Sequence, residues 1–247
     1  MKELIVGIIQ GITEFLPVSS SGHLVLTQSI LKISKPGIEF EIFLHFSTLL
    51  AVLIFFFKEI KNFARKENPK NHPLTLIIIG SIPAGVIGVL FKDKIELYFE
   101  NTTYLPYFYL ITTAMLFSTS LRKKAVRENI TILDALIIGT AQAIAILPGV
   151  SRSGATISTA LLLGILPEKA FSFSFLLSIP AIFGAMILDL KDANFSTLLS
   201  YAPAGTIAFL FGIASLYILK KTLKMNKLHY FGFYTLIVAI LTFGLKL

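Results

Sequence analysis

The chain has 247 residues, of which 55% are hydrophobic and only 15% are charged, and its mean hydropathy is +0.79. Soluble domains carry about 25% charged residues, so the composition indicates an integral membrane protein. The absence of cysteine excludes disulfides, thiolate zinc sites and a cysteine nucleophile. The net charge of +8 gathers in the predicted loops, as the positive-inside rule expects, and therefore does not indicate a nucleic-acid partner.

The apolar segments predict an all-α polytopic membrane protein made of one domain. A bilayer-spanning helix needs about 20 apolar residues. Two stretches, 4–31 and 131–166, are each interrupted by a cluster of Pro, Gly and Ser, which predicts two re-entrant helical hairpins. Six further segments are predicted to cross the membrane: 40–57, 74–91, 106–121, 170–188, 198–219 and 229–245.

The loop charges predict an orientation. The basic loops 58–73, 122–128 and 220–228 are expected in the cytoplasm, whereas the balanced loops 92–105 and 189–197 are expected outside. This alternation places both termini outside, opens the first hairpin outward and opens the second toward the cytoplasm.

An internal repeat accompanies this alternation. Shifting the chain by 132 residues aligns 7–22 with 139–154 at seven identical positions, including a Ser-x-Ser-Gly pattern in each break. We therefore predict two repeats, 1–125 and 126–247, each with one hairpin and three spans. Because three is odd, the second repeat is inverted, and such folds place a site where the broken helices meet.

Three ionisable residues lie within the hairpins, namely Glu14, His23 and Arg152. Ionisable groups are costly in lipid, so each is a functional candidate. If the two breaks meet, these charges converge on one another. A purely structural Glu14–Arg152 pair is the alternative, but it does not account for the surrounding serines and glycines.

Those small residues suit a phosphate ligand. Backbone amides at helix starts bind phosphate, glycine permits their close approach, and the arginine fork matches phosphate oxygens. The candidate phosphate contacts are Ser19, Ser20, Ser21, Gly149, Ser151, Ser153, Gly154 and Thr156.

A metal and a proton carrier are also predicted. Gln10 and Glu14 share a helix face, and their oxygens suit Mg²⁺ or Ca²⁺ bridging phosphate oxygens; Gln10 as a packing hydrogen bonder is the alternative. His23 is a candidate nucleophile, general acid or proton shuttle, or else a satisfied polar contact. We expect a structural role for His45.

The residues 10–23 and 148–156 resemble the two signatures of bacterial undecaprenyl-pyrophosphate phosphatase of the bacitracin-resistance type, and the likeness follows nearly the whole chain. The resemblance implies a multi-pass plasma-membrane enzyme that removes the terminal phosphate of undecaprenyl pyrophosphate. This reaction recycles the lipid carrier of peptidoglycan synthesis and confers bacitracin resistance. The resemblance further implies a divalent metal, a site facing the outer side and a homodimer.

Carried over by motif position, Glu14, His23 and Arg152 are the essential polar groups and Ser20 is the proposed nucleophile. Attack by His23 or by a metal-activated water stays open. Aromatic residues such as Phe43, Phe171 and Phe175 are predicted to line a groove for the prenyl tail or to be plain core. A lipid transporter and a non-catalytic scaffold are the rival functions.

Overall fold

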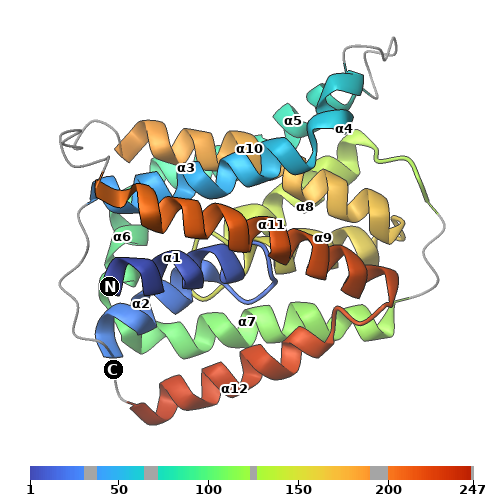
Figure 1. Ribbon diagram of the computed structural model, residues 1–247. Helices are drawn as coiled ribbons and strands as arrows, with labels where there is room; N and C mark the ends of the chain where they lie inside the picture. The colour runs from blue at the N-terminus through green and yellow to red at the C-terminus, as the bar shows by residue number, and fades with distance from the viewer. Residues whose placement is uncertain (31–37, 64–71, 123–126, 190–199, 246–247) are drawn as a thin grey trace.

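A computed structural model describes residues 1–30, 38–63, 72–122, 127–189 and 200–245 (Figure 1). All regular elements within these ranges are helices, and the one pairing of extended backbone is an isolated bridge between Arg127 and Ile165. The expected all-α fold is therefore confirmed. Most of the helices run roughly parallel to one axis and form one bundle.

The helices follow the predicted order in both halves of the chain. The first half contains α1 (Lys2–Thr13), α2 (Ser20–Ile30), α3 (Ile38–Phe55), α4 (Phe57–Phe63), α5 (Pro73–Leu90), α6 (Lys92–Glu100) and α7 (Leu105–Ser118). Single 3₁₀ turns at Thr102–Tyr104 and Thr119–Leu121 flank α7. The second half contains α8 (Ile132–Ile144), α9 (Arg152–Leu162), α10 (Pro167–Asp189), α11 (Ala202–Lys224) and α12 (Tyr230–Leu245).

Both predicted hairpins are present as broken helices. Non-helical backbone separates α1 from α2 and α8 from α9, at the two Pro, Gly and Ser clusters. Figure 1 shows the two hairpins entering the bundle from opposite ends and turning near its middle. Proline supplies no amide donor and fixes its own backbone angle, which explains why neither helix continues through the break.

Among the residues that the structure describes, three helices are long and apolar enough to cross a membrane: α5, α11 and the Pro167–Ile187 part of α10. The bent pair α3 and α4, which meet at 69°, counts as a fourth if it forms one span. Helices α7 and α12 also lie where spans are predicted, but they have 14 and 16 residues. The arrangement of six spans with two re-entrant hairpins therefore stays a prediction.

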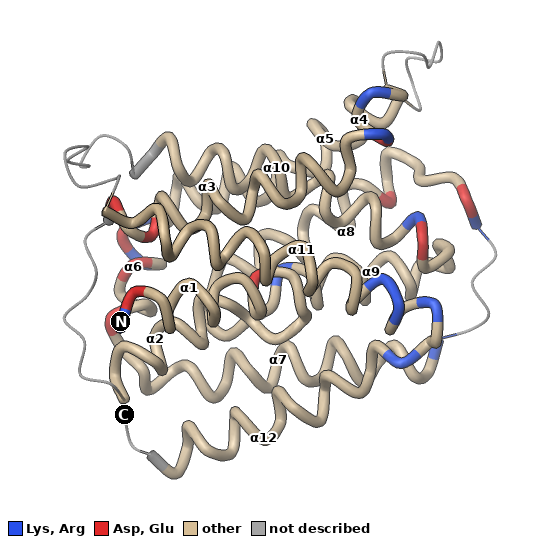
Figure 2. The backbone as a smooth tube through the Cα atoms, viewed as in Figure 1, with Lys and Arg blue, Asp and Glu red and all other residues tan. Residues whose placement is uncertain are grey.

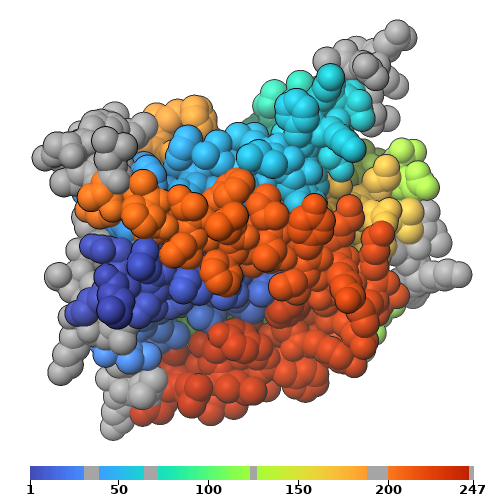
Figure 3. All heavy atoms as spheres, in the orientation of Figure 1, coloured from blue at the N-terminus to red at the C-terminus, as the bar shows by residue number. Residues whose placement is uncertain are grey.

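Each hairpin packs its first helix against the other half of the chain. Helix α1 lies along α11, and α8 lies along α5. A Cβ atom on Gly7 would lie 2.5 Å from the carbonyl oxygen of Ala204, and one on Gly139 would collide with the backbone of Gly80. Glycine thus permits backbone-to-backbone packing of the kind found between membrane helices. Figure 3 shows α1 lying between α11 and α12 on one face.

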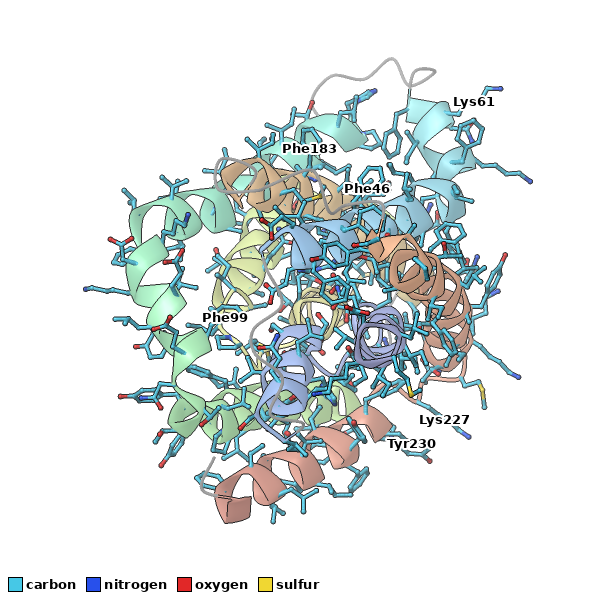
Figure 4. All side chains as sticks on the ribbon, turned by 60° about the vertical axis from the view of Figure 1, so that its left-hand side comes forward. Phe46, Lys61, Phe99, Phe183, Lys227 and Tyr230 are labelled. Atoms are coloured by element: carbon cyan, nitrogen blue, oxygen red, sulfur yellow. The ribbon has the colours of Figure 1, made fainter. Side chains whose placement is uncertain are left out.

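The core around the breaks is aromatic. Phe15 lies edge-on to Phe175 at 5.5 Å between ring centroids, and Phe171 packs on both Phe175 and Phe56. All four rings are buried. Phe171 and Phe175 are therefore core residues. This confirms the second predicted role for them, plain core, and not the lining of a groove for the prenyl tail. Large apolar side chains are instead exposed on the outside, for example Phe46 and Phe183 (Figure 4).

Most of the described charges lie at the two ends of the bundle (Figure 2). One end, at α4, at the end of α11 and around the turn before α8, is rich in Lys and Arg, and Lys61 and Lys227 project outward there (Figure 4). The other end, at the N-terminus and α6, mixes both signs. The predicted loop residues Arg65, Lys66, Lys70, Lys123, Lys124, Lys191 and Asp192 lie outside the described residues.

Candidate active site

An ion pair joins the two hairpins at their breaks. Arg152 Nη2 donates to Glu14 Oε1 at 2.8 Å, although the two residues are 138 positions apart. The side chains are only 15% and 5% exposed, respectively. An ion pair with so little access to water interacts more strongly than one on a protein surface. The structure thus brings together the acid and the guanidinium that the sequence predicts to converge.

The second oxygen of Glu14 accepts two further hydrogen bonds. Ser20 Oγ donates at 2.6 Å and Gln10 Nε2 donates at 3.1 Å. Ser20 is the first residue of α2, and Gln10 lies one turn before Glu14 at the end of α1. A hydroxyl within hydrogen-bonding distance of a carboxylate is the arrangement of a nucleophile with its general base. Four of the predicted site residues therefore form one connected cluster.

The two breaks are built in the same way. Ser19 Oγ accepts from the amide of Gly22 at 3.3 Å, and Ser151 Oγ accepts from the amide of Gly154 at 3.1 Å. Each serine hydroxyl also lies 3.3 Å from the hydroxyl two residues later, that of Ser21 or Ser153. These hydroxyls satisfy amides at helix starts that have no partner within the helix. The repeated sequence pattern therefore has a repeated structure.

The two breaks also contact each other directly. The amide of Gly149 donates to Ser19 Oγ at 3.0 Å. Gly149 has a φ of +100°, a conformation that side chains with a Cβ rarely adopt. Thr112 on α7 holds this segment, because its hydroxyl donates to the Gly149 carbonyl at 2.8 Å and accepts from the Ser151 amide at 2.9 Å. Thr112 was not predicted, since a threonine within an apolar span carries no distinguishing signal.

His23 lies beside this cluster but faces another direction. Its Nδ1 atom is 2.7 Å from the Ser19 carbonyl oxygen and 3.0 Å from the Tyr109 hydroxyl, and its Nε2 atom is 2.7 Å from the Tyr234 hydroxyl. The described contacts of its ring thus lead to α7 and α12 and not to Glu14. Neither tyrosine was predicted, because neither lies in the two motifs.

Thr156 is directed away from the Glu14 carboxylate. Its hydroxyl donates to the Arg152 carbonyl at 2.8 Å and lies 2.6 Å from the Ser174 hydroxyl on α10, in a fully buried position. Thr156 therefore ties the first turn of α9 to α10. Ser153 is buried as well, next to Ser151.

Two polar atoms next to the ion pair are buried and have no hydrogen-bond partner, namely Gln10 Oε1 and Arg152 Nη1. Buried polar atoms are rarely left unpaired, so both suit a ligand. Within the described ranges no group of three His, Asp or Glu residues could hold a metal. The oxygens of Gln10 and Glu14 therefore fit a cation only if phosphate oxygens supply further ligands, which is how Mg²⁺ often binds. His45 Nδ1 lies 3.4 Å from Gln10 Nε2.

Residues 3–241 match the protein family described as bacitracin resistance protein BacA. The chain belongs to this family. Among its curated relatives, the undecaprenyl-diphosphatase of Thermosipho africanus strain TCF52B is 43% identical over 248 residues, covering 98% of this chain and 99% of the relative. The undecaprenyl-diphosphatase of Thermotoga petrophila is 41% identical, with 98% of each chain covered. That of Methanosphaera stadtmanae is 38% identical, covering 98% and 96%. The predicted resemblance to the BacA family is confirmed.

Proposed function

We propose that this chain is a membrane-bound undecaprenyl-diphosphatase. It hydrolyses the terminal phosphate of undecaprenyl pyrophosphate to give undecaprenyl phosphate and orthophosphate. One observation carries the proposal: the Ser20 hydroxyl lies 2.6 Å from a buried carboxylate, Glu14, that Arg152 reaches from the opposite hairpin. The names of relatives 38–43% identical over nearly the whole chain support the same activity.

The pyrophosphate binds where the two breaks meet. The unpaired Nη1 atom of Arg152 donates to a phosphate oxygen, and the guanidinium holds the headgroup next to Ser20. The proposed phosphate contacts are the hydroxyls of Ser19, Ser21, Ser151 and Ser153. The amides of Gly149 and Gly154 donate to Ser19 and Ser151 in the structure, and they would contact the phosphate only by exchanging these acceptors. Thr156 acts behind this layer, by supporting the backbone of Arg152.

Ser20 Oγ attacks the terminal phosphorus while Glu14 Oε2 accepts its proton. The bond from that phosphorus to the bridging oxygen breaks, and undecaprenyl phosphate leaves with the electron pair. Water then hydrolyses the phosphoserine and releases orthophosphate. Positioning and charge stabilisation supply most of the rate in phosphoryl transfer, which matches a site built from one base, one guanidinium and several serine hydroxyls. The geometry favours Ser20 over His23 as the attacking group, because only Ser20 contacts Glu14.

We further propose that the reaction uses a divalent cation, Mg²⁺ or Ca²⁺, which Gln10 Oε1 and Glu14 would hold. When bound, it neutralises charge on the phosphates. Dialysis against a chelator is expected to abolish orthophosphate release, and added Mg²⁺ or Ca²⁺ is expected to restore it. Full activity after chelation would contradict the proposed metal requirement and would leave the proposed attack by Ser20 unaffected.

The mechanism is tested by comparing alanine variants of two neighbouring serines, Ser20 and Ser21. Purified protein in detergent is assayed for orthophosphate release from a short-chain prenyl pyrophosphate. Ser20→Ala is expected to lose about a hundredfold or more in kcat, since the nucleophile and its base no longer work together. Ser21→Ala, whose hydroxyl contacts Ser19 and not Glu14, is the matched comparison: loss of one proposed phosphate contact is expected to raise KM and to leave kcat within about tenfold of the native value.

Phosphoenzyme trapping separates the possible nucleophiles. Rapid quenching with a substrate labelled at the terminal phosphate is expected to label the native protein and not Ser20→Ala. Full turnover by Ser20→Ala would overturn the assignment of the nucleophile. Movement of the lipid across the bilayer without orthophosphate release would instead favour the transporter.

The same proposal includes the membrane arrangement. We propose six spans and two re-entrant hairpins in two inverted repeats, 1–125 and 126–247, in the plasma membrane. The site opens to the outer side, the protein is a homodimer, and its product re-enters peptidoglycan synthesis, which gives bacitracin resistance. The entry of the hairpins from opposite ends and the repeated hydrogen bonds of the breaks support this arrangement.

A further inference from the structure

Helices α7 and α12 form one wall beside the first break. The hydroxyls of Thr113 and Thr235 lie 2.8 Å apart between the two helices, and both are buried. A Cβ atom on Gly232 would lie 2.8 Å from the Phe117 ring, so glycine permits the close approach of α12. These contacts set the rotation and register of α12 relative to α7. They thereby place Tyr234, the neighbour of Thr235, against His23.

The hydrogen bonds around His23 determine which ring nitrogen carries the proton. The Ser19 carbonyl oxygen has no proton to give, so Nδ1, 2.7 Å away, must be the donor. In a neutral imidazole Nε2 is then an acceptor, and the Tyr234 hydroxyl donates to it at 2.7 Å. The Tyr234 ring also lies nearly parallel to the imidazole, with 5.7 Å between centroids and 6° between planes. The Ser19 carbonyl therefore fixes the tautomer of His23, and Tyr234 bonds the remaining ring nitrogen and orients the ring.

His23 in turn holds the backbone next to Ser20. Ser19 has a φ of +68°, an uncommon conformation for a residue with a side chain. Its carbonyl oxygen accepts from both the backbone amide and the ring of His23, at 3.2 and 2.7 Å. The peptide that links Ser19 to Ser20 is thus fixed by the imidazole. Its orientation decides how Ser20 meets Glu14.

We propose that Tyr234 is a positioning residue that acts through His23 and Ser19 to aim Ser20 at the terminal phosphorus. This inference rests on the proposed phosphatase function. It gives α12 a part in catalysis, although 211 residues separate Tyr234 from His23.

Tyr109 contacts the same imidazole ring but at the other nitrogen, so its role differs from that of Tyr234. Its hydroxyl lies 3.0 Å from Nδ1, whose proton already has the Ser19 carbonyl as acceptor. Removal of the Tyr109 hydroxyl leaves both ring nitrogens with a partner, whereas removal of the Tyr234 hydroxyl leaves Nε2 with none. The geometry therefore predicts a larger loss of turnover for Tyr234→Phe than for Tyr109→Phe.

The kinetic experiment compares Tyr234→Phe with Tyr230→Phe. Tyr230 lies one turn earlier on α12, is 55% exposed against 44% for Tyr234, and packs beside Lys227 (Figure 4). Tyr234→Phe is expected to lower kcat on the order of tenfold to a hundredfold, because small displacements of a reacting group cost that much. Its KM is expected to stay nearly unchanged, since Arg152 still binds the headgroup. Tyr230→Phe is expected to match the native protein in both constants.

A spectroscopic measurement tests the same contact without relying on activity. The four histidines are labelled with ¹⁵N, and His23 is assigned by its loss in His23→Gln. The native spectrum is expected to show protonated Nδ1 and hydrogen-bonded, unprotonated Nε2. In Tyr234→Phe the Nε2 signal is expected to shift, and in Tyr230→Phe it is expected to stay in place.

The outcomes distinguish the two proposals. Absence of orthophosphate release by the native protein would refute the phosphatase function, and the ¹⁵N spectrum would still decide whether Tyr234 holds His23. An active native protein with full kcat in Tyr234→Phe overturns the role of Tyr234. A native His23 that carries its proton on Nε2 overturns it as well, even if the variant does not fold.

Discussion

At the scale of single residues, the Glu14–Arg152 ion pair combines stability with chemistry. Glu14 is nearly inaccessible, and Arg152 is the one cationic partner that the described contacts give it. Arg152→Ala leaves a buried carboxylate without its counter-charge, so the free energy of unfolding is expected to fall by about 3–5 kcal/mol. Orthophosphate release is expected to be lost too. Unfolding monitored by heat or denaturant in detergent checks the first effect, and the phosphate assay checks the second.

Two further variants serve as controls for Arg152→Ala: one changes Glu14 alone, and the other removes both charges. Glu14→Gln alone keeps a hydrogen-bond acceptor for Ser20 but lacks the base, so we expect a folded protein with kcat lower by about a hundredfold or more. The double variant Glu14→Gln with Arg152→Ala is expected to regain much of the stability lost in Arg152→Ala and none of the activity. Equal stability of Arg152→Ala and the native protein would contradict this assignment.

At the scale of elements, the shape of the second break depends on Gly149. Alanine at this position would need a φ of +100°, and its Cβ would lie 2.9 Å from Phe108 Cβ and 3.1 Å from the Leu105 carbonyl oxygen. We expect Gly149→Ala to lower the free energy of unfolding by about 1–3 kcal/mol from backbone strain alone. We also expect reduced turnover, since the Gly149 amide would leave Ser19. Thermal unfolding and the phosphate assay measure both.

Gly184 on α10 provides the comparison for Gly149. A Cβ there meets no atom within 4 Å, and the residue lies within a helix. Gly184→Ala is therefore expected to be neutral or to stabilise the protein by about 0.5–1 kcal/mol, because alanine favours helix. If both variants behaved alike, the conformation of the second break would not matter for folding.

At the scale of the whole molecule, the two ends of the bundle should face opposite sides of the membrane. The chain has no cysteine, so single cysteines report their own position. Asp93→Cys on α6 and Lys221→Cys on α11 replace exposed residues at opposite ends. With a membrane-impermeant thiol reagent, Asp93→Cys is expected to react in intact cells. Lys221→Cys is expected to react only after the membrane is opened, because basic loops stay inside.

Reversed labelling would contradict the predicted orientation and the outward-facing site. Labelling of both positions in intact cells would contradict the crossing of α5 and α11 through the membrane. Each single-cysteine variant serves as the control for the other.

The helical class, the two broken hairpins and the residues at their breaks were predictable from the sequence. These features depend on neighbouring residues: apolar runs favour helices in a membrane, and Pro, Gly and Ser end them locally. The convergence of Glu14 and Arg152 was also predictable, since a buried charge needs a partner and few charges lie within the hairpins. The sequence did not predict that Thr156 points toward Ser174 or that Phe175 is fully buried, because both depend on contacts with distant segments.

Which residues of α7 and α12 reach the site depends instead on packing between distant parts of the chain. Tyr109, Thr112 and Tyr234 lie in apolar helices whose hydropathy is nearly the same on every side, so the sequence does not show which face points inward. Their rotation and register follow from contacts between distant segments, such as Thr113 with Thr235 and Gly232 with Phe117. Local patterns therefore specify where the helices break, whereas close packing between helices specifies what surrounds the breaks.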